Sequence, residues 1–205
     1  MIDKETQLWR EYECLRSEIR GADSLNYQIM GIVVGAVAAL LTTGFKEAEP
    51  IIRLLVFLCV YVVTIPGYRL LQGNRRRTWR ISTYIRTFLE PQLEFAKWET
   101  RLDSQRRRAG EDSTRQYFSS LVGTNEWFII SVMNILAALA AVFSGLLQIN
   151  TDLSVKAGGV VGIAILNLWL LLVTSRQEKD LRPLGRVEQG FLKSWIEIRE
   201  AEQQR

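Results

Sequence analysis

Four long apolar runs alternate with charged segments along this chain. The runs lie near residues 25–44, 51–71, 127–148 and 155–174. The first run falls between Asp23 and Lys46, and the 22 residues between these charges extend roughly 33 Å as an α-helix. The hydrocarbon core of a bilayer is about 30 Å thick. The pattern therefore predicts an all-α polytopic membrane protein with four transmembrane helices.

Short links join the four runs in pairs. Residues 45–50 connect the first run to the second, and residues 150–152 connect the third to the fourth. Links this short place successive helices next to each other and antiparallel. We therefore expect two transmembrane hairpins.

Three charged segments, residues 1–24, 73–126 and 175–205, carry apolar residues at helical spacing. This spacing places the apolar side chains of each segment on one face of a helix and predicts amphipathic helices outside the bilayer. The sets are Leu8, Tyr12, Leu15 and Ile19 in the first segment, Ile81, Tyr84, Ile85 and Phe88 in the second, and Val187, Phe191, Trp195 and Ile198 in the third.

Prolines predict where these helices continue and where they end. Residues 1–49 contain no proline, so the first amphipathic helix can run into the first apolar run as one helix over about 4–43. Pro66 and Gly67 predict a kink or a loosened last turn in the second run. Pro91 predicts the end of the central amphipathic helix, and a second helix is expected over 92–108.

Lysine and arginine are distributed very unevenly around the apolar runs. Of the 26, 23 lie in the three charged segments or at their membrane edge, and the others are Lys46, Arg53 and Lys156. Cytoplasmic loops of membrane proteins carry the excess of positive charge. Both termini and the central segment are therefore expected in the cytoplasm.

Small residues stand at four-residue intervals within three of the apolar runs. Such spacing allows two helix backbones to approach closely in a bilayer. These residues are predicted to form helix-packing faces, within the chain or between copies: Gly31, Gly35, Ala39, Ala137, Ala141, Gly145, Gly158 and Gly162.

Two asparagines lie inside the apolar runs. Asn134 and Asn167 stand at similar depth on successive antiparallel helices, roughly 10 Å from the cytoplasmic boundary. A hydrogen bond between them would contribute about 0.6–2 kcal/mol in a membrane. This structural role is favoured over a pore-lining or ligand-binding role.

Several arginines border the first hairpin. They are predicted to contact anionic lipid headgroups, an attraction worth about 1 kcal/mol per charge near the surface. The residues are Arg53, Arg69, Arg75, Arg76, Arg77 and Arg80. The three arginines at 106–108 could bind an acidic partner or nucleic acid, but a solvated helix end is the favoured interpretation.

The sequence contains no pattern that indicates catalysis. Histidine is absent, and no nucleophile motif, phosphate-binding loop or metal-ligand cluster occurs. The two cysteines, Cys14 and Cys59, lie in a charged helix and an apolar run, so no disulfide is expected. Glu90, Glu94 and Glu99 are assigned to a solvated helix face. We expect a protein without enzymatic activity, cofactor or metal.

The central segment resembles a known group of proteins. The strings RTWRISTYIRTFLEP at 77–91 and KWETR at 97–101 are similar to paired motifs in uncharacterised small bacterial integral membrane proteins, in which a hydrophobic hairpin precedes them. The resemblance covers about residues 5–105. It implies a bacterial inner-membrane protein and assigns no site residues.

These observations predict a non-enzymatic, four-span inner-membrane protein whose cytoplasmic helices form a bundle for self-association or for binding a protein partner. The expected partners are the lipid bilayer, further copies of the chain and a cytoplasmic protein, and not nucleic acid. An oligomeric pore or membrane-disrupting effector is the alternative, although the runs contain no Asp or Glu to line a cation pathway. An enzyme acting on lipid, using Cys14 or the central glutamates, ranks third.

Overall fold

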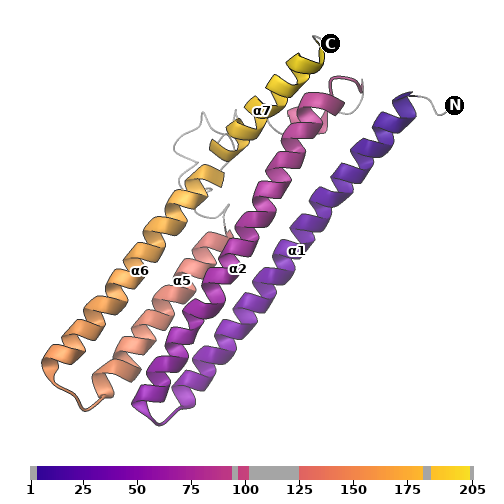
Figure 1. Ribbon diagram of the computed structural model, residues 1–205. Helices are drawn as coiled ribbons and strands as arrows, with labels where there is room; N and C mark the ends of the chain where they lie inside the picture. The colour runs from indigo at the N-terminus through magenta and orange to yellow at the C-terminus, as the bar shows by residue number, and fades with distance from the viewer. Residues whose placement is uncertain (1–3, 94–96, 102–124, 182–185, 204–205) are drawn as a thin grey trace. The chain divides into compact units, whose positions relative to one another are not determined.

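The structure is a computed structural model that describes residues 4–93, 97–101, 125–181 and 186–203 (Figure 1). Within these ranges the regular secondary structure is helical, and no strand is present. The elements are α1 (Lys4–Lys46), α2 (Pro50–Tyr84), a π-helical turn η1 (Ile85–Leu89), α5 (Asn125–Ala140), a second π-helical turn η2 (Ala141–Gly145), a 3-10 turn η3 (Leu146–Gln148), α6 (Leu153–Leu181) and α7 (Arg186–Gln203).

Four helical segments of the described chain are long and apolar enough to cross a membrane. They are Lys4–Lys46, Pro50–Leu89, Phe128–Gln148 and Leu153–Gln177. Each of them contains one of the four predicted apolar runs. The all-helical class and the four candidate spans are thus confirmed.

The chain divides into two compact units. Unit 1 comprises Met1–Tyr27, Gln72–Ser120 and Lys179–Arg205. Unit 2 comprises Gln28–Leu71 and Leu121–Glu178, and it contains most of the four apolar runs. The long helices α1 and α2 each contribute residues to both units.

Two helices extend farther than their apolar runs. α1 is unbroken from Lys4 to Lys46, as the absence of proline predicted. α2 also continues through Pro66 and Gly67, so the predicted loosened last turn is wrong, and the alternative of a kink there stays a prediction. A Cβ at Gly67 would lie 2.5 Å from Val33 Cγ2. The glycine therefore permits close packing against α1, which holds this part of α2 helical.

Pro91 ends the central helix, as predicted. The π-helical turn η1 closes at Leu89, where the Glu90 amide donates to the Ile85 carbonyl at 2.9 Å. Of the second helix expected over 92–108, only residues 97–101 are described beyond Leu93, and 98–101 are helical. The remainder of that prediction lies outside the described residues.

Unit 2 is built around three clusters of buried apolar side chains. One cluster joins Val33 and Val37 of α1 to Val60 of α2 and Ala137 of α5. The other two centre on Met30, Tyr68, Leu71 and Ile130, and on Phe57, Ala140 and Ala141. Ala137 and Ala141 are fully buried, so the predicted small face of the third run packs within the chain.

Gly145 continues this small face and packs against the backbone of α2. We expect Gly145→Val to destabilise unit 2 by about 1–3 kcal/mol. A Cβ at Gly145 would lie 3.0 Å from Leu54 Cβ and 3.1 Å from Leu54 Cα. The backbone of a packed helix cannot move aside as the end of a flexible side chain can. Nothing lies within 4 Å of a Cβ at Gly162, so Gly162→Val is the matched control. Equal unfolding midpoints of the two variants in detergent would contradict this packing.

The small residues of the first run lie on the opposite side of α1 from its packed side. Gly31, Gly35 and Ala39 are exposed, and a Cβ at either glycine meets nothing within 4 Å. Successive helical residues are about 100° apart, so Gly31 points roughly 160° away from Val33. Packing through Val33 and Val37 therefore turns the glycines outward, and they form no contact face with the part of the chain that the structure describes.

The small pair of the fourth run behaves in the same way. Gly158 and Gly162 are exposed, with open space around a Cβ at each position. Gly159, which was not among the predicted small residues, instead lies close to Leu146. A Cβ added at Gly159 would be 2.6 Å from Leu146 Cδ2. In this part of α6, close intrachain packing therefore involves Gly159 and not the predicted pair.

The core of unit 1 is formed by the apolar stripes of α1 and α2. Its buried residues are Tyr12, Ile19, Ile81, Ile85, Leu89 and Leu93, with Leu8, Leu15 and Tyr84 packed against them. Beside this core, the ring of Trp195 on α7 meets Tyr84 edge-to-face at 5.4 Å and Phe88 at 5.9 Å. These contacts bring η1 and α7 together within unit 1.

Candidate functional site

Unit 1 contains three buried carboxylates, which are the most unusual chemical feature of the described chain. Glu90, Glu99 and Glu188 are only 2%, 4% and 2% exposed. The assignment of Glu90 and Glu99 to a solvated face is therefore wrong, and Glu94 lies outside the described residues. A buried carboxylate is costly unless it is paired and hydrogen-bonded, so the partners of each explain why it is tolerated.

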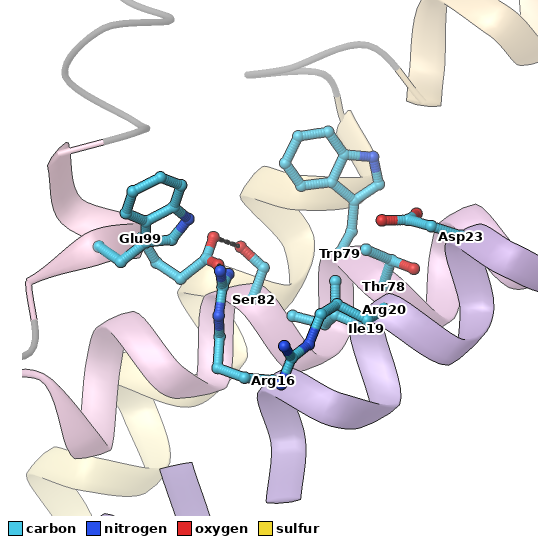
Figure 2. A pocket seen from close by; sticks show the side chains of 9 residues that line it. Arg16, Ile19, Arg20, Asp23, Thr78, Trp79, Ser82 and Glu99 are labelled. Atoms are coloured by element: carbon cyan, nitrogen blue, oxygen red, sulfur yellow. Dashed lines mark hydrogen bonds and ion pairs between the residues drawn. The ribbon is translucent and has the colours of Figure 1, made fainter. Parts of the chain in front are cut away.

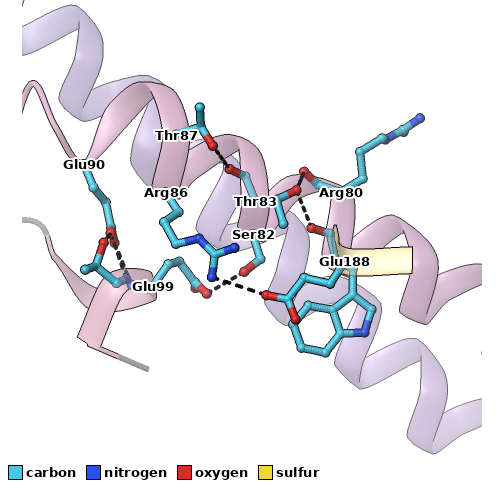
Figure 3. A network of polar contacts seen from close by, with 10 residues as sticks. Arg80, Ser82, Thr83, Arg86, Thr87, Glu90, Glu99 and Glu188 are labelled. Carbon is cyan, nitrogen blue, oxygen red and sulfur yellow. Dashed lines mark hydrogen bonds and ion pairs between the residues drawn. The ribbon is translucent and has the colours of Figure 1, made fainter. Parts of the chain in front are cut away.

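Glu90 caps the short helical turn that follows Lys97. Its carboxylate accepts hydrogen bonds from the Glu99 amide at 2.6 Å, the Thr100 amide at 2.9 Å and the Thr100 hydroxyl at 2.5 Å (Figure 3). Amides at the start of a helical turn have no partner within the turn, and a negative charge is favourable there. Glu90 thus closes the loop between the end of η1 and residues 97–101.

Glu99 joins three segments of unit 1. Its carboxylate forms an ion pair with Arg16 Nη1 of α1 at 2.5 Å, and it accepts a hydrogen bond from Ser82 Oγ of α2 at 2.7 Å. The Arg16 guanidinium also lies over the Trp98 ring, 5.4 Å from its centroid. One buried carboxylate therefore links α1, α2 and the segment 97–101.

A second ion pair connects η1 to α7. Arg86 Nη1 lies 3.2 Å from Glu188 Oε1, and both side chains are largely buried (Figure 3). Arg199 of α7 also donates to the Thr87 carbonyl at 3.3 Å. The π-helical turn that carries Arg86 and Thr87 is a geometry found frequently at functional sites.

Tyr84 lies beside this network and binds α1. Its hydroxyl donates to the Glu11 carboxylate at 2.8 Å. Burial, together with this hydrogen bond, raises the pKa of Tyr84 to about 12. Tyr84 is therefore protonated throughout the physiological range and acts as a hydrogen-bond donor.

A cavity of about 280 Å³ opens beside the Arg16–Glu99 ion pair. α1 contributes Arg16, Arg20 and Asp23 to its lining, and α2 contributes Trp79 and Ser82 (Figure 2). Trp98 and Glu99 also line it. Charged groups of both signs and two indole rings thus surround one space within unit 1, which makes this cavity the candidate ligand site.

In unit 2 the two predicted intramembrane asparagines bind α2 instead of each other. Thr64 donates to Asn134 Oδ1 at 2.8 Å, and Asn167 Nδ2 donates to the Tyr61 hydroxyl at 2.6 Å. The Tyr61 hydroxyl in turn lies 3.4 Å from the Asn134 carbonyl and donates to it. Because α2 brings two hydroxyls to this depth, the polar groups are connected through α2.

Arg53 forms hydrogen bonds with two other parts of unit 2. Its Nε donates to the Glu47 carbonyl at 2.9 Å, and its Nη1 donates to the Ser144 carbonyl at 2.7 Å and to Gln148 Oε1 at 2.8 Å. The guanidinium thereby satisfies carbonyl groups at the ends of two helices, where no helical partner is available. Arg53 is only half-buried, and its contact with lipid stays a prediction.

The other predicted headgroup arginines have varied surroundings. Arg77 forms an ion pair with Glu18, to which its Nε donates at 2.9 Å. Arg69, Arg76 and Arg80 are exposed, and Arg75 is half-buried. Their contact with lipid stays a prediction.

The described residues contain little that suggests other chemistry. Among them, no cluster of three or more His, Cys, Asp or Glu residues suitable for a metal ion is found. Cys14 and Cys59 are free and exposed. Comparisons with protein families, with curated proteins and with solved structures find no match. The case for a function therefore comes from the geometry of this chain.

The sequence analysis missed the buried network, although one signal for it was present. Arg16 follows Tyr12 by four residues and precedes Ile19 by three, so it interrupts the apolar stripe of α1. Ser82 similarly lies next to Ile81 in the stripe of α2. A charged and a polar residue at core positions indicate a buried partner, but the identity of Glu99 required the fold.

Proposed function

We propose that this chain is a non-enzymatic four-span protein that self-associates within a bacterial inner membrane, with unit 1 as its cytoplasmic helical bundle. The observation that carries the proposal is the open glycine face of α1. Gly31 and Gly35 stand one turn apart on an apolar helix, and apart from the backbone of α1 and the adjoining residues, no atom of the described residues lies within 4 Å of a Cβ at either position. A glycine face of this kind suits close approach of a second helix.

The burial of the candidate spans supports this proposal. In the most apolar windows of α1 and α6, only 22% and 6% of residues are buried, against 39% in the segment Phe128–Gln148. α6 also presents open glycines at Gly158 and Gly162. The spans with the least intrachain packing are thus those with unoccupied small-residue faces.

The charge distribution supports the proposed orientation. Of the 26 lysines and arginines, 23 lie in segments that would face the cytoplasm if α1 and α2, and the segments Phe128–Gln148 and α6, form two hairpins. The resemblance of residues 5–105 to bacterial membrane proteins supports the inner membrane as the location. Unit 1 would then present α1, α2 and α7 to a cytoplasmic partner or to a second copy.

Self-association is testable with a fluorescent label on one native cysteine. Cys14 is exposed and accepts a fluorescent label once Cys59 is replaced by serine. In liposomes, we expect energy transfer between labelled copies, and we expect Gly31→Leu with Gly35→Leu to weaken association about tenfold, or ~1.4 kcal/mol. Leucine side chains would hold the helix backbones apart.

Val34→Leu is the matched control, because Val34 is exposed on the same helix but lies about 100° from Gly35, the middle of the face formed by Gly31, Gly35 and Ala39. Energy transfer no greater than that of a non-interacting membrane protein, at any protein-to-lipid ratio, would refute self-association. The same liposomes, loaded with a self-quenching dye, distinguish an inert assembly from the alternative of a pore, because only a pore releases the dye.

A further inference from the structure

The cavity beside Arg16 carries two charges that the buried network does not use. Arg16 and Glu99 neutralise each other at 2.5 Å. Arg20 and Asp23 also line the cavity, and among the described residues neither has an ion-pair partner. Figure 2 shows the Arg20 guanidinium and the Asp23 carboxylate apart. The space therefore offers one free positive group and one free negative group.

This arrangement favours a zwitterionic ligand over a simple anion or cation. A simple anion would pair with Arg20 but would be repelled by the carboxylate of Asp23. A simple cation would pair with Asp23 but would be repelled by the guanidinium of Arg20. A ligand that carries both charges can pair with Arg20 and Asp23 simultaneously. The guanidinium of arginine suits phosphate oxygens, to which it donates two parallel hydrogen bonds.

The indole rings suit the positive end of such a ligand. Trp79 and Trp98 line the cavity together with Asp23, and Trp98 is 54% exposed. The face of an indole attracts an ammonium group, and the attraction increases where the group is partly desolvated. A carboxylate next to an indole is therefore suited to bind a primary ammonium.

The position of the cavity along α1 indicates where such a ligand would be found. Asp23 and Arg20 precede Leu25, the first residue of the apolar run, by two and five residues. In a continuous helix these offsets correspond to roughly 3 Å and 7.5 Å of axial rise. If the run begins at the edge of the hydrocarbon, both residues lie at the level of the phospholipid headgroups, where tryptophan is also enriched.

We propose that this cavity binds a phosphoethanolamine group, with the phosphate on Arg20 and the primary ammonium on Asp23 and the adjacent indole. The cavity of 280 Å³ is far larger than the roughly 30 Å³ occupied by a water molecule, so it admits a small headgroup. The group can belong to a phospholipid or to a soluble ester such as glycerophosphoethanolamine. This assignment does not depend on self-association.

The test measures binding to the full chain in detergent by native mass spectrometry. Micelles carry phosphatidylethanolamine, phosphatidylcholine or phosphatidylglycerol at equal mole fraction. We expect phosphatidylethanolamine to bind about tenfold tighter than the other two, as suits a charge-assisted hydrogen bond that they cannot form. Arg20→Gln should weaken phosphatidylethanolamine binding by about the same factor, and Asp23→Asn should remove the preference over phosphatidylglycerol.

Matched controls exist on the same helix. Arg10 and Glu13 are exposed and do not line the cavity, so Arg10→Gln and Glu13→Gln should bind as the native chain does. Arg20 and Asp23 are also exposed, so their variants should keep native helicity, which circular dichroism checks.

Competition with glycerophosphoethanolamine identifies the source of the group. If the soluble ester binds as tightly as the lipid, the ligand is a soluble one. If only the lipid binds, the ligand is a headgroup. Both outcomes support the proposal. Equal binding of the three lipids, unchanged binding in both cavity variants, or equal binding of inorganic phosphate and the soluble ester would overturn it.

Discussion

Arg16→Met should destabilise unit 1 by on the order of 3 kcal/mol. The substitution removes the cation that lies 2.5 Å from the Glu99 carboxylate, which is 4% exposed and would keep only the Ser82 hydroxyl as a partner. A buried charge without its counter-ion costs more than the pair contributes. Amide hydrogen exchange over the first 22 residues of α1 measures the loss, because these amides are protected while unit 1 is folded.

A double-mutant cycle distinguishes this loss from a simple packing defect. Arg16→Met combined with Glu99→Met should recover most of the stability, because no unpaired charge then remains. Additive losses in the double variant would show that the ion pair is not what joins α1 to residues 97–101.

Glu90→Ala should lower the stability of unit 1 by about 2–3 kcal/mol. The carboxylate of Glu90 accepts hydrogen bonds from the backbone amides of Glu99 and Thr100 and from the Thr100 hydroxyl. The hydrogen bond from the Glu99 amide is buried. Without the carboxylate, the amides of Glu99 and Thr100 lose the acceptor that caps the turn. Thermal unfolding in detergent, followed by tryptophan fluorescence, gives the change, and exchange of these two amides locates it.

Glu197→Ala provides the control for the removal of a glutamate from unit 1. Glu197 is exposed on α7, and its 3.9 Å contact with Lys193 is a surface pair one helical turn away. Such pairs contribute about 0.3–0.5 kcal/mol. If the Glu90 and Glu197 variants unfold at the same temperature, Glu90 is not a structural cap.

The contrast between Glu90 and Glu197 illustrates a general limit of the sequence analysis. Both glutamates occur in charged, helix-forming segments, and local pattern assigns both to solvent. Burial of Glu90 depends on the chain reversing after Pro91, which brings the amides of residues 99 and 100 back to its carboxylate. That reversal is a tertiary event, and no helical periodicity records it.

The intramembrane asparagines show the same limit. Their similar depth followed from counting residues along two helices, and the structure places each of them in a polar cluster. Their partners, Tyr61 and Thr64, are on α2 and could not be chosen from depth alone, because the rotation of each helix about its axis was unknown. Arg53 is a parallel case, since one of its carbonyl partners, Ser144, lies far along the chain.

The sequence by itself determined the helical class, the four candidate spans, the continuity of α1 and the end of the central helix before Pro91. These features follow from local causes, namely the length of the apolar runs and the restriction that proline imposes on its neighbour. Tertiary structure alone decided which face of each helix is covered. It turned Gly31 and Gly35 outward, buried Ala141 and Glu99, and enclosed the cavity beside Arg20, because helix rotation and chain reversal depend on the sum of contacts among distant segments.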